Sequence, residues 1–330
     1  FLDLVYVRAD AVPGGNGSSW ESAFSSIGKA LLISSRDGEV WVAGGIYHER
    51  VLIVESVDIY AGFSGNEKTR RQLDWVMNQT IIDAGGSGSA VTVANEAILD
   101  GFTVTGGHDE GGVYCSAYSP TLINCTITGN SGSGVYCENS SPMLTNCTIT
   151  GNSGSGVYCV NSSPMLTNCT ITRNTARWFD GCGVYCVNSS PTLTNCTITG
   201  NTAGRGARGV YCGESSPTLT NCILWNPGVE ITQDRLSSAV IEHSCIEHGY
   251  EGIGNIDMNP LFVDPANDDF HLQEGSPCID AGNPDPSYND ACLPPGLGTE
   301  RCDMGAYGGP GNCGWAEPQE PTAVREWALY

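Results

Sequence analysis

The residues best suited to chemistry in this sequence are its cysteines. The chain of 330 residues holds 16 of them, and ten form pairs spaced ten residues apart, with an eleventh continuing the second series. The two series are Cys115/Cys125, Cys137/Cys147, Cys159/Cys169, Cys186/Cys196 and Cys212/Cys222, followed by Cys245. Free thiols acting as small apolar fillers and disulfides within or between repeats both fit this spacing. Metal binding fits poorly because no CxxC pair and no nearby histidine accompany the series.

A second group of cysteines lies near the C-terminus, among acidic and proline-rich loops. Cys278, Cys292, Cys302 and Cys313 are candidates for disulfides there, because such loops have little regular structure to hold them. The same region supplies oxygen ligands of the kind that Ca²⁺ prefers. The candidate ligands are Asp264, Asp268, Asp269, Asp280 and Asp285. Their spacing does not match an EF-hand, and solvated turns explain the same residues.

Acid–base chemistry has few candidate residues. Hydrolysis of a polysaccharide needs two placed carboxylates, and elimination needs a positioned base. From Val113 to Thr172 the only charged side chain is Glu138. Histidines and acids gather elsewhere, as His48-Glu49, as His108-Asp109-Glu110, and as His243 with Glu247-His248. We interpret these groups as surface turns, and the sequence therefore favours a protein without a catalytic site.

Composition narrows the classes of partner. There are 14 Lys and Arg against 36 Asp and Glu, which gives a formal net charge of −22. This charge disfavours binding to nucleic acid and to anionic membrane surfaces. No run of about 20 apolar residues is present, so no membrane-spanning helix is predicted. The many cysteines favour an oxidising, extracellular location.

The cysteines are positioned by a repeat. One phrase, GVYCENSSPMLTNCTITGN at residues 134–152, occurs in five copies between residues 112 and 226 with small changes. The second cysteine of each copy recurs after steps of 22, 22, 27 and 26 residues. Repeats of this period are typical of stacked, quasi-one-dimensional proteins.

Each copy reads as three short strands and three corners. Val135 and Cys137 share one strand face, and Cys147 and Ile149 share another. Leu144 has the opposite parity, so the chain must turn near Asn146 if all these side chains point inward. Asn-Ser-Ser-Pro and Gly-Asn-Ser-Gly supply the other corners. The pattern predicts an all-β, right-handed parallel β-helix. A leucine-rich repeat fits poorly, because each copy has one leucine and no helical stretch.

The sequence divides into four predicted parts: 1–107, an N-terminal cap and irregular coils; 108–250, the regular repeats; 251–316, an acidic loop-rich C-terminal cap; and 317–330, a tail. Within the first part, Leu4 to Val7 reads as a strand. Ser18 with Glu21 reads as a capping box, opening a helix in which Trp20, Phe24, Ile27 and Leu31 recur at helical spacing. Such a helix would cover the open end of the solenoid. Phe102 occupies the cysteine position of an upstream coil, which indicates an interior site.

Two parts of the chain resemble a known family. The phrases GSSWESAF (17–24), VWVAGGIY (40–47), YAGFSGNE (60–67) and LDGFTVTGG (99–107) resemble the N-terminal part of bacterial secreted right-handed parallel β-helix repeat proteins. NPLFVDP (259–265), GSPCIDAG (275–282) and DMGAYGG (303–309) resemble the C-terminal module called choice-of-anchor Q. The resemblance implies a secreted, surface-associated β-helix and assigns no activity.

These features lead to two hypotheses of function. The first is a non-catalytic structural protein of the cell surface or of an extracellular filament, polymerising head to tail. Its self-association candidates are Val324, Trp327, Leu329 and Tyr330. The second is a β-helix that binds or cleaves carbohydrate. The best glycosylation acceptors among nine Asn-x-Ser/Thr sequons are Asn139, Asn161 and Asn188, which are expected at an outer corner.

Overall fold

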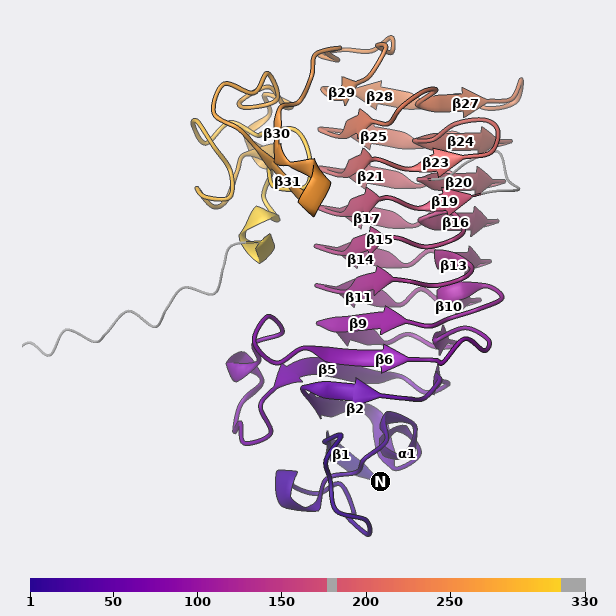
Figure 1. The fold of residues 1–330 in the computed structure, drawn as a ribbon, viewed down its shortest axis with the longest axis vertical. Helices are drawn as coiled ribbons and strands as arrows, with labels where there is room; N and C mark the ends of the chain where they lie inside the picture. Colours follow the sequence, from indigo (N-terminus) through magenta and orange to yellow (C-terminus); the bar gives the residue numbers. More distant parts are fainter. Residues whose placement is uncertain (177–182, 316–330) are drawn as a thin grey trace, which may run out of the picture.

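The structure is a computed structural model, and it describes residues 1–176 and 183–315. The four self-association candidates, Val324 to Tyr330, lie outside the described residues. Within these limits the chain winds into a long stack of coils, with one further module against its flank (Figure 1). The coils pair in parallel, so the β-helix prediction is confirmed.

One coil follows the three strands and three corners predicted for a repeat. In-register pairing stacks Val135 on Val157 and Cys137 on Cys159. The corner before the second strand begins at Asn139 with φ +51°, and the corner before the third strand is Asn146 with φ +52°. Asparagine tolerates this left-handed backbone better than most residues do. The repeated corners thus explain why asparagine recurs at these two positions.

Three parallel sheets run the length of the described solenoid. Sheet I contains β1 (Leu2–Val7), β2 (Ser34–Ala43), β5 (Val57–Phe63), β8 (Ile98–Asp100), β11 (Thr121–Ile123), β14 (Met143–Thr145), β17 (Met165–Thr167), β21 (Thr192–Thr194), β25 (Thr218–Thr220) and β28 (Val240–Glu242). Sheet II contains β4 (Val51–Ile53), β7 (Val91–Val93), β10 (Gly111–Ser116), β13 (Ser133–Glu138), β16 (Val157–Val160), β20 (Val184–Val187), β24 (Val210–Gly213) and β27 (Ile231–Gln233). Sheet III contains β3 (Gly45–Tyr47), β6 (Thr80–Asp83), β9 (Phe102–Thr105), β12 (Thr126–Thr128), β15 (Thr148–Thr150), β18 (Thr170–Thr172), β22 (Thr197–Thr199), β26 (Ile223–Trp225) and β29 (Cys245–Ile246).

The remaining elements are short. They are the parallel pair β19 (Thr175–Ala176) and β23 (Thr202–Ala203), the antiparallel pair β30 (Phe262–Asp264) and β31 (Asp269–Leu272), the helix α1 (Ile27–Leu31), and the 3₁₀ turns η1 (Trp20–Ser22), η2 (Arg70–Gln72), η3 (Pro265–Asn267), η4 (Pro286–Tyr288) and η5 (Asn312–Trp315). No helix among the described residues is long and apolar enough to cross a membrane.

The interior of the solenoid is a set of stacked apolar columns. Both cysteine series point into it, and all their thiols are buried and free. These thiols are Cys115, Cys125, Cys137, Cys147, Cys159, Cys169, Cys186, Cys196, Cys212, Cys222 and Cys245. Phe102 lies in the second cysteine column, next to Cys125, and is 1% exposed, so its predicted interior position is confirmed.

The disulfide alternative for the two cysteine series is wrong, and Cys222 shows why. Its Sγ donates to the Leu193 carbonyl at 3.6 Å and to the Thr220 carbonyl at 3.4 Å, so it contacts backbone oxygen and forms no S–S bond. Side chains stacked in register on parallel strands stand side by side at about 4.8 Å. A disulfide needs Cβ atoms closer than this, at about 3.5–4.5 Å. Cys222 and the other ten cysteines of the series are therefore corrected to unpaired thiols.

These free thiols act as core packing. The neighbouring thiol of Cys137 and burial together raise the pKa of Cys115 well above its usual value. A buried thiol with a raised pKa carries little thiolate, and the thiolate is the reactive form. Cys115 therefore fills space as a small apolar side chain does, and the other cysteines of the two columns are equally buried and without a disulfide.

A buried asparagine column runs beside the cysteines at the third corner of each coil. Each side-chain amide donates to the side-chain oxygen of the asparagine one coil on, at 2.9 to 3.2 Å. The same oxygen also accepts the backbone N–H of the preceding asparagine. The members are Asn130, Asn152, Asn174, Asn201 and Asn226. We call this set the asparagine ladder, and each amide-to-amide bond in it points towards the C-terminal coils.

The outer face of sheet II carries a column of stacked tyrosines. Ring centroids of successive members are 4.7 to 5.6 Å apart. The members are Tyr114, Tyr136, Tyr158, Tyr185 and Tyr211. The repeat therefore uses its aromatic faces for contacts between coils.

The predicted N-terminal helix is wrong in its extent. The segment forms η1 and then α1, which has five residues, with extended backbone between them. Phe24 lies in this extended part and bridges to Val7, accepting and donating hydrogen bonds along β1. Edge pairing with β1 has outweighed the helical spacing of the apolar residues. The short α1 still packs on the first coils, in contact with β1, β2 and β4.

The C-terminal module runs back along the flank of the solenoid (Figure 1). It follows the outer corner between sheets I and III, where the side-chain amides of Asn195 and Asn168 donate to its backbone carbonyls. Asn221 accepts the backbone N–H of Asn283, and Trp315 donates to the Asn168 carbonyl at 3.1 Å. The corner asparagines thus form the docking site for the module.

Candidate functional site

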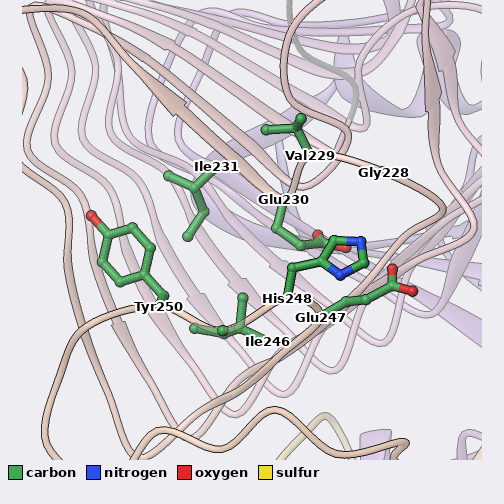
Figure 2. Close-up of a pocket in the computed structure, with 9 residues that line it drawn as sticks. Gly228, Val229, Glu230, Ile231, Ile246, Glu247, His248 and Tyr250 are labelled. Atoms are coloured by element: carbon green, nitrogen blue, oxygen red, sulfur yellow. The ribbon is translucent and has the colours of Figure 1, made fainter.

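A pocket of about 190 Å³ opens at the last coil, where the asparagine ladder ends. Its lining residues belong to the turn before β27, the turn after β29 and the adjoining ends of these two strands. Figure 2 shows Glu230, Glu247 and His248 gathered in one part of the pocket, with Ile231, Ile246 and Tyr250 around the rest. The pocket therefore combines an apolar wall with three groups that can exchange protons.

Glu230 is held in this pocket by the end of the asparagine ladder. The side-chain amide of Asn226 donates to Glu230 Oε2 at 2.8 Å, and the Asn226 backbone N–H donates to Oε1. A further asparagine here would leave its own amide without an acceptor, whereas a carboxyl group supplies two acceptor oxygens. Because every bond of the ladder donates towards the C-terminal coils, the last asparagine needs an acceptor. Glu230 supplies it where the next asparagine would stand.

The surroundings of Glu230 favour its protonated form. Burial raises the pKa of Glu230 to about 8, the hydrogen bonds from Asn226 oppose that shift, and the nearby charge of Glu247 adds to it. The side chain is 5% exposed. At neutral pH this carboxyl group is therefore largely protonated and able to donate a proton.

Glu247 is the second carboxyl group of the pocket. Its Oε2 is buried and has no hydrogen-bond partner in the described part of the chain. Its backbone N–H donates to the Leu224 carbonyl at 3.0 Å, which fixes the turn after β29. A protonated carboxyl group beside a second carboxyl group is the pairing that general acid–base catalysis of glycosidic bonds uses.

The sequence indicated only a surface turn at His243, Glu247 and His248, but in the structure Glu247 and His248 line this pocket, and His243 does not. Glu230 was missed, because it stands alone in the sequence. The repeat nevertheless contained a clue. The asparagine that recurs in each copy donates to the next copy, so the last one, Asn226, needs an acceptor of another residue type. The other predicted groups are turns: Glu49 accepts the backbone N–H groups of Ile27 and Gly28 at the start of α1, and His108 contacts Asp109 at 2.8 Å.

The five aspartates predicted as calcium ligands are not brought together. Among the described residues, no group of three or more His, Cys, Asp or Glu side chains is arranged to hold a metal ion. The partners are Asn267 for Asp264, Arg173 for Asp268, His271 for Asp269, Thr299 for Asp280 and the Ser287 N–H for Asp285. The geometry therefore gives the calcium prediction no support.

The C-terminal cysteines divide into two groups. Cys292 and Cys313 form a disulfide across 21 residues of chain. Cys278 and Cys302 are free and buried, so the disulfide prediction is wrong for these two. Burial raises the pKa of Cys302 to about 12, and an amide of Asn195 donates to its sulfur. One of the expected staples is thus present, and the other two cysteines pack in the interface with the solenoid.

The three glycosylation candidates lie on the surface. Asn139, Asn161 and Asn188 are exposed and occupy the first corner of successive coils, each with φ near +50°. Asn161 donates to Asn139 at 3.3 Å. The corner is accessible, and modification there stays a prediction.

A further polar group on sheet I serves a structural role. Arg70 donates to Glu39 Oε1 at 2.7 Å and to the Tyr60 hydroxyl at 2.8 Å, with its guanidinium 4.4 Å from the Tyr60 ring centre. This clamp holds the loop that contains η2 over the aromatic cluster of the first coils. The pocket at the last coil is therefore the better candidate for function.

The fold is similar to that of solved structures with little sequence in common. A pectate lyase, Pel9A, superposes with a TM-score of 0.51 at 14% identity, covering 92% of this chain and 95% of that chain. The pectin methylesterase PemA from Erwinia chrysanthemi gives a TM-score of 0.49 at 9% identity, covering 75% of this chain and 90% of that chain. No curated protein matches in sequence. At these identities the likeness concerns the fold alone.

A family model provides the assignment. The model described as a right handed beta helix region matches residues 44–171 and 165–260. The matched residues take in the repeats, the irregular coils before them and the pocket turns. The chain therefore belongs to the family of right-handed β-helix proteins.

Proposed function

We propose that the protein acts outside the cell on a polysaccharide, with Glu230 and Glu247 as an acid–base pair in the pocket at the last coil. The observation that carries the proposal is the buried Glu230, whose pKa is raised to about 8 beside a second carboxyl group. In this assignment Glu230 donates a proton to the leaving oxygen, and Glu247 acts as base or nucleophile. The name of the pectate lyase with this fold adds support for a polysaccharide substrate.

An extracellular location is part of the same proposal. The disulfide between Cys292 and Cys313 is of the kind that persists in oxidising compartments. The net charge of −22 also suits a protein that stays dispersed outside the cell. Export with a cleavable leader and detection of the protein in the culture medium would test this part separately.

The test is an activity assay of the full chain on acidic and neutral polysaccharides. New reducing ends report hydrolysis, and ultraviolet absorbance of unsaturated ends reports elimination. We expect Glu230→Gln and Glu247→Gln each to lower kcat by about a hundredfold or more. Activity should also fall as pH rises through about 8, where Glu230 loses its proton.

The matched control is Glu242→Gln, on sheet I away from the pocket. This variant should keep full activity. Cleavage that survives both pocket substitutions, or a wild-type chain that cleaves none of the substrates, would overturn the proposal.

The regular repeats favour a second candidate function, a structural protein that polymerises head to tail. The observation is the surface from Val113 to Thr172, which repeats in each coil and carries one charged side chain, Glu138. Light scattering and electron microscopy across pH would reveal filaments. Deletion of Val324 to Tyr330 should abolish them if that segment makes the contact.

A further inference from the structure

A second pocket lies on the outer face of sheet III, between β26 and the hairpin of β30 and β31. Its volume is about 440 Å³. The lining residues are Thr199, Trp225, Asn259, Leu261, Phe262, Pro265 and Gln273. All seven side chains are uncharged, in a protein with a net charge of −22. We name it the Trp225 pocket.

Two departures from the repeat meet at this pocket. Threonines pair in register along one outer column of sheet III through Thr128, Thr150, Thr172 and Thr199, and the next coil has Trp225 in that column. An indole ring thus ends a column of hydroxyl groups. The ring is half-buried, packed on one side against the core beneath the C-terminal module.

The second departure is Arg173. Three other copies have glycine at this corner, with φ near +65°, and Arg173 adopts φ +52° there. Its guanidinium donates to the Pro265 carbonyl at 2.8 Å and pairs with Asp268 at 3.1 Å. A left-handed arginine is unfavourable, so the contacts must compensate. They fix the turn of the hairpin that forms the far wall of the Trp225 pocket.

Unused hydrogen-bonding groups line the same pocket. In the described part of the chain, the indole N–H of Trp225 makes no hydrogen bond. Gln273 uses its amide N–H on the Phe262 carbonyl at 2.8 Å, so its side-chain oxygen remains an acceptor. Asn259 uses its side-chain oxygen on the Leu261 N–H at 3.0 Å, so its amide remains a donor. The pocket therefore offers an aromatic face with donors and an acceptor at its rim.

We infer that the Trp225 pocket binds a neutral sugar unit of a polysaccharide. The apolar C–H face of a pyranose would pack on the indole, and its hydroxyl groups would bond to Asn259, Gln273 and the indole N–H. An aromatic wall with a few placed polar groups is the usual composition of a small-molecule site. A uronate would bring a carboxylate to a pocket with no cation in its lining. The inference rests on the proposed polysaccharide function and narrows it to a neutral chain.

The experiment is a titration of the full chain with oligosaccharides. Binding is measured by calorimetry and by the change in tryptophan fluorescence. The probes are neutral β-1,4-linked oligomers of glucose, xylose and mannose, and an acidic oligogalacturonate. We expect a neutral oligomer to bind and the acidic one not to bind. Trp225→Ala should weaken binding by about tenfold to a hundredfold, and Trp225→Phe should weaken it less, because an aromatic face remains.

The matched control is Trp75→Phe, which lies near Gly101 on another part of the surface and should bind as the wild type does. Arg173→Ala should weaken binding and increase hydrogen exchange in 262–272, because the hairpin loses its anchor. Unchanged affinity in Trp225→Phe and folded Trp225→Ala, or binding of the acidic oligomer alone, would overturn the inference.

The same titration separates this inference from the proposed function. If Glu230→Gln abolishes cleavage but Trp225→Ala leaves binding intact, the pocket assignment fails and the function stands. If no variant or wild-type chain cleaves any substrate, yet neutral oligomers bind through Trp225, the acid–base assignment fails and the sugar site stands.

Discussion

The middle coils and the last coils of the solenoid differ in how their polar groups are satisfied. In the middle, polar side chains of several columns bond to their own copies one coil away, as Asn152 bonds to Asn174 at 2.9 Å and Thr172 to Thr150 at 3.0 Å. At the end no further copy exists, and a different residue type must replace it. Glu230 and Trp225 stand at such positions. The comparison teaches that a repeat of this kind pairs polar groups with their own copies along its length and presents other residue types where its columns end.

The largest effect is expected from breaking the asparagine ladder in its middle. Asn152→Ala removes the acceptor of the Asn130 backbone and side-chain N–H groups and the donor to the Ile127 carbonyl. Buried groups left without partners cost about 1–3 kcal/mol each. We expect the free energy of unfolding to fall by about 4 kcal/mol, measured by denaturant titration.

The control for this prediction is Ser153→Ala, at the next residue, whose side chain is exposed. It should change the free energy of unfolding by less than about 0.5 kcal/mol. A loss at Asn152 no larger than the loss at Ser153 would mean that the ladder contributes little, and that the apolar columns alone define the coils.

The sequence predicted the coils better than it predicted the ends, for a physical reason. In the repeats the inward parity of Val135 and Cys137 and the corner at Asn146 follow from local pattern, and stacking one copy on the next enforces the pattern. The first coil has no preceding copy to stack on. Phe24 therefore pairs with the free edge of β1, although its spacing had predicted a helix. The local sequence pattern therefore predicts the structure reliably only where each coil stacks on a copy of itself.

The state of the inward cysteines did not follow from their spacing. The ten-residue interval between Cys212 and Cys222 is compatible with packing and with crosslinking alike. The choice depends on the separation of side chains between stacked coils, which favours free thiols in this chain. Spacing along the sequence therefore predicts which face a cysteine occupies, and it does not predict its bond.

The candidate site was predictable only in part. Glu247 and His248 were grouped because they are adjacent in the chain, but the sequence led us to interpret them as a surface turn. Glu230 lies 17 residues from Glu247 in sequence, and its importance depends on Asn226 and the direction of the ladder. Trp225 could have been noticed as the residue that breaks a threonine column. What it faces depends on the path of the C-terminal module, which the sequence does not specify.

The second largest effect is expected in the module on the flank. Replacing both Cys292 and Cys313 by Ala removes a crosslink that closes about 21 residues. Closing a loop of this size contributes about 3 kcal/mol. We expect the module to lose about this much stability while the coils keep theirs. Hydrogen exchange should therefore rise within 260–315 and stay unchanged in 113–176 and 183–200.

A uniform rise of exchange along the whole chain would contradict that distinction. It would show that the module and the coils unfold as one unit. The reduced wild-type protein provides the control, because it should match the double variant if no other cysteine contributes.

The next effect is a pH dependence that arises in the last coil and in the C-terminal module. Burial raises the pKa of Glu230 to about 8, of Asp290 to about 7 and of Asp303 to about 6. In the unfolded chain these groups lose their protons near pH ~4. Between these values the folded state binds more protons, so stability is highest at low pH and falls as pH rises through the folded pKa values.

For Glu230 alone the fall is about 1.4 kcal/mol per pH unit, or about 2 kcal/mol from pH 5.5 to pH 7. The charge of Glu247 favours the shift, and Arg208 opposes it. Thermal unfolding of Glu230→Gln should therefore show a shallower slope over this range than the wild type. An identical slope would mean that Glu230 is ionised in the fold and that the proton donor must be sought elsewhere.

The smallest expected effect is that of calcium on the module. Asp268 is already paired with Arg173, and Asp280 accepts two hydrogen bonds from Thr299. An ion would have to displace such partners before it gained ligands, so chelation or added Ca²⁺ should shift the melting temperature by less than about 1 °C. A ligand that binds the folded state raises stability in proportion to the logarithm of its concentration. A calcium-dependent rise would therefore require the aspartates to regroup around the ion, and would show that the module, unlike the regular coils, can rearrange to bind a ligand.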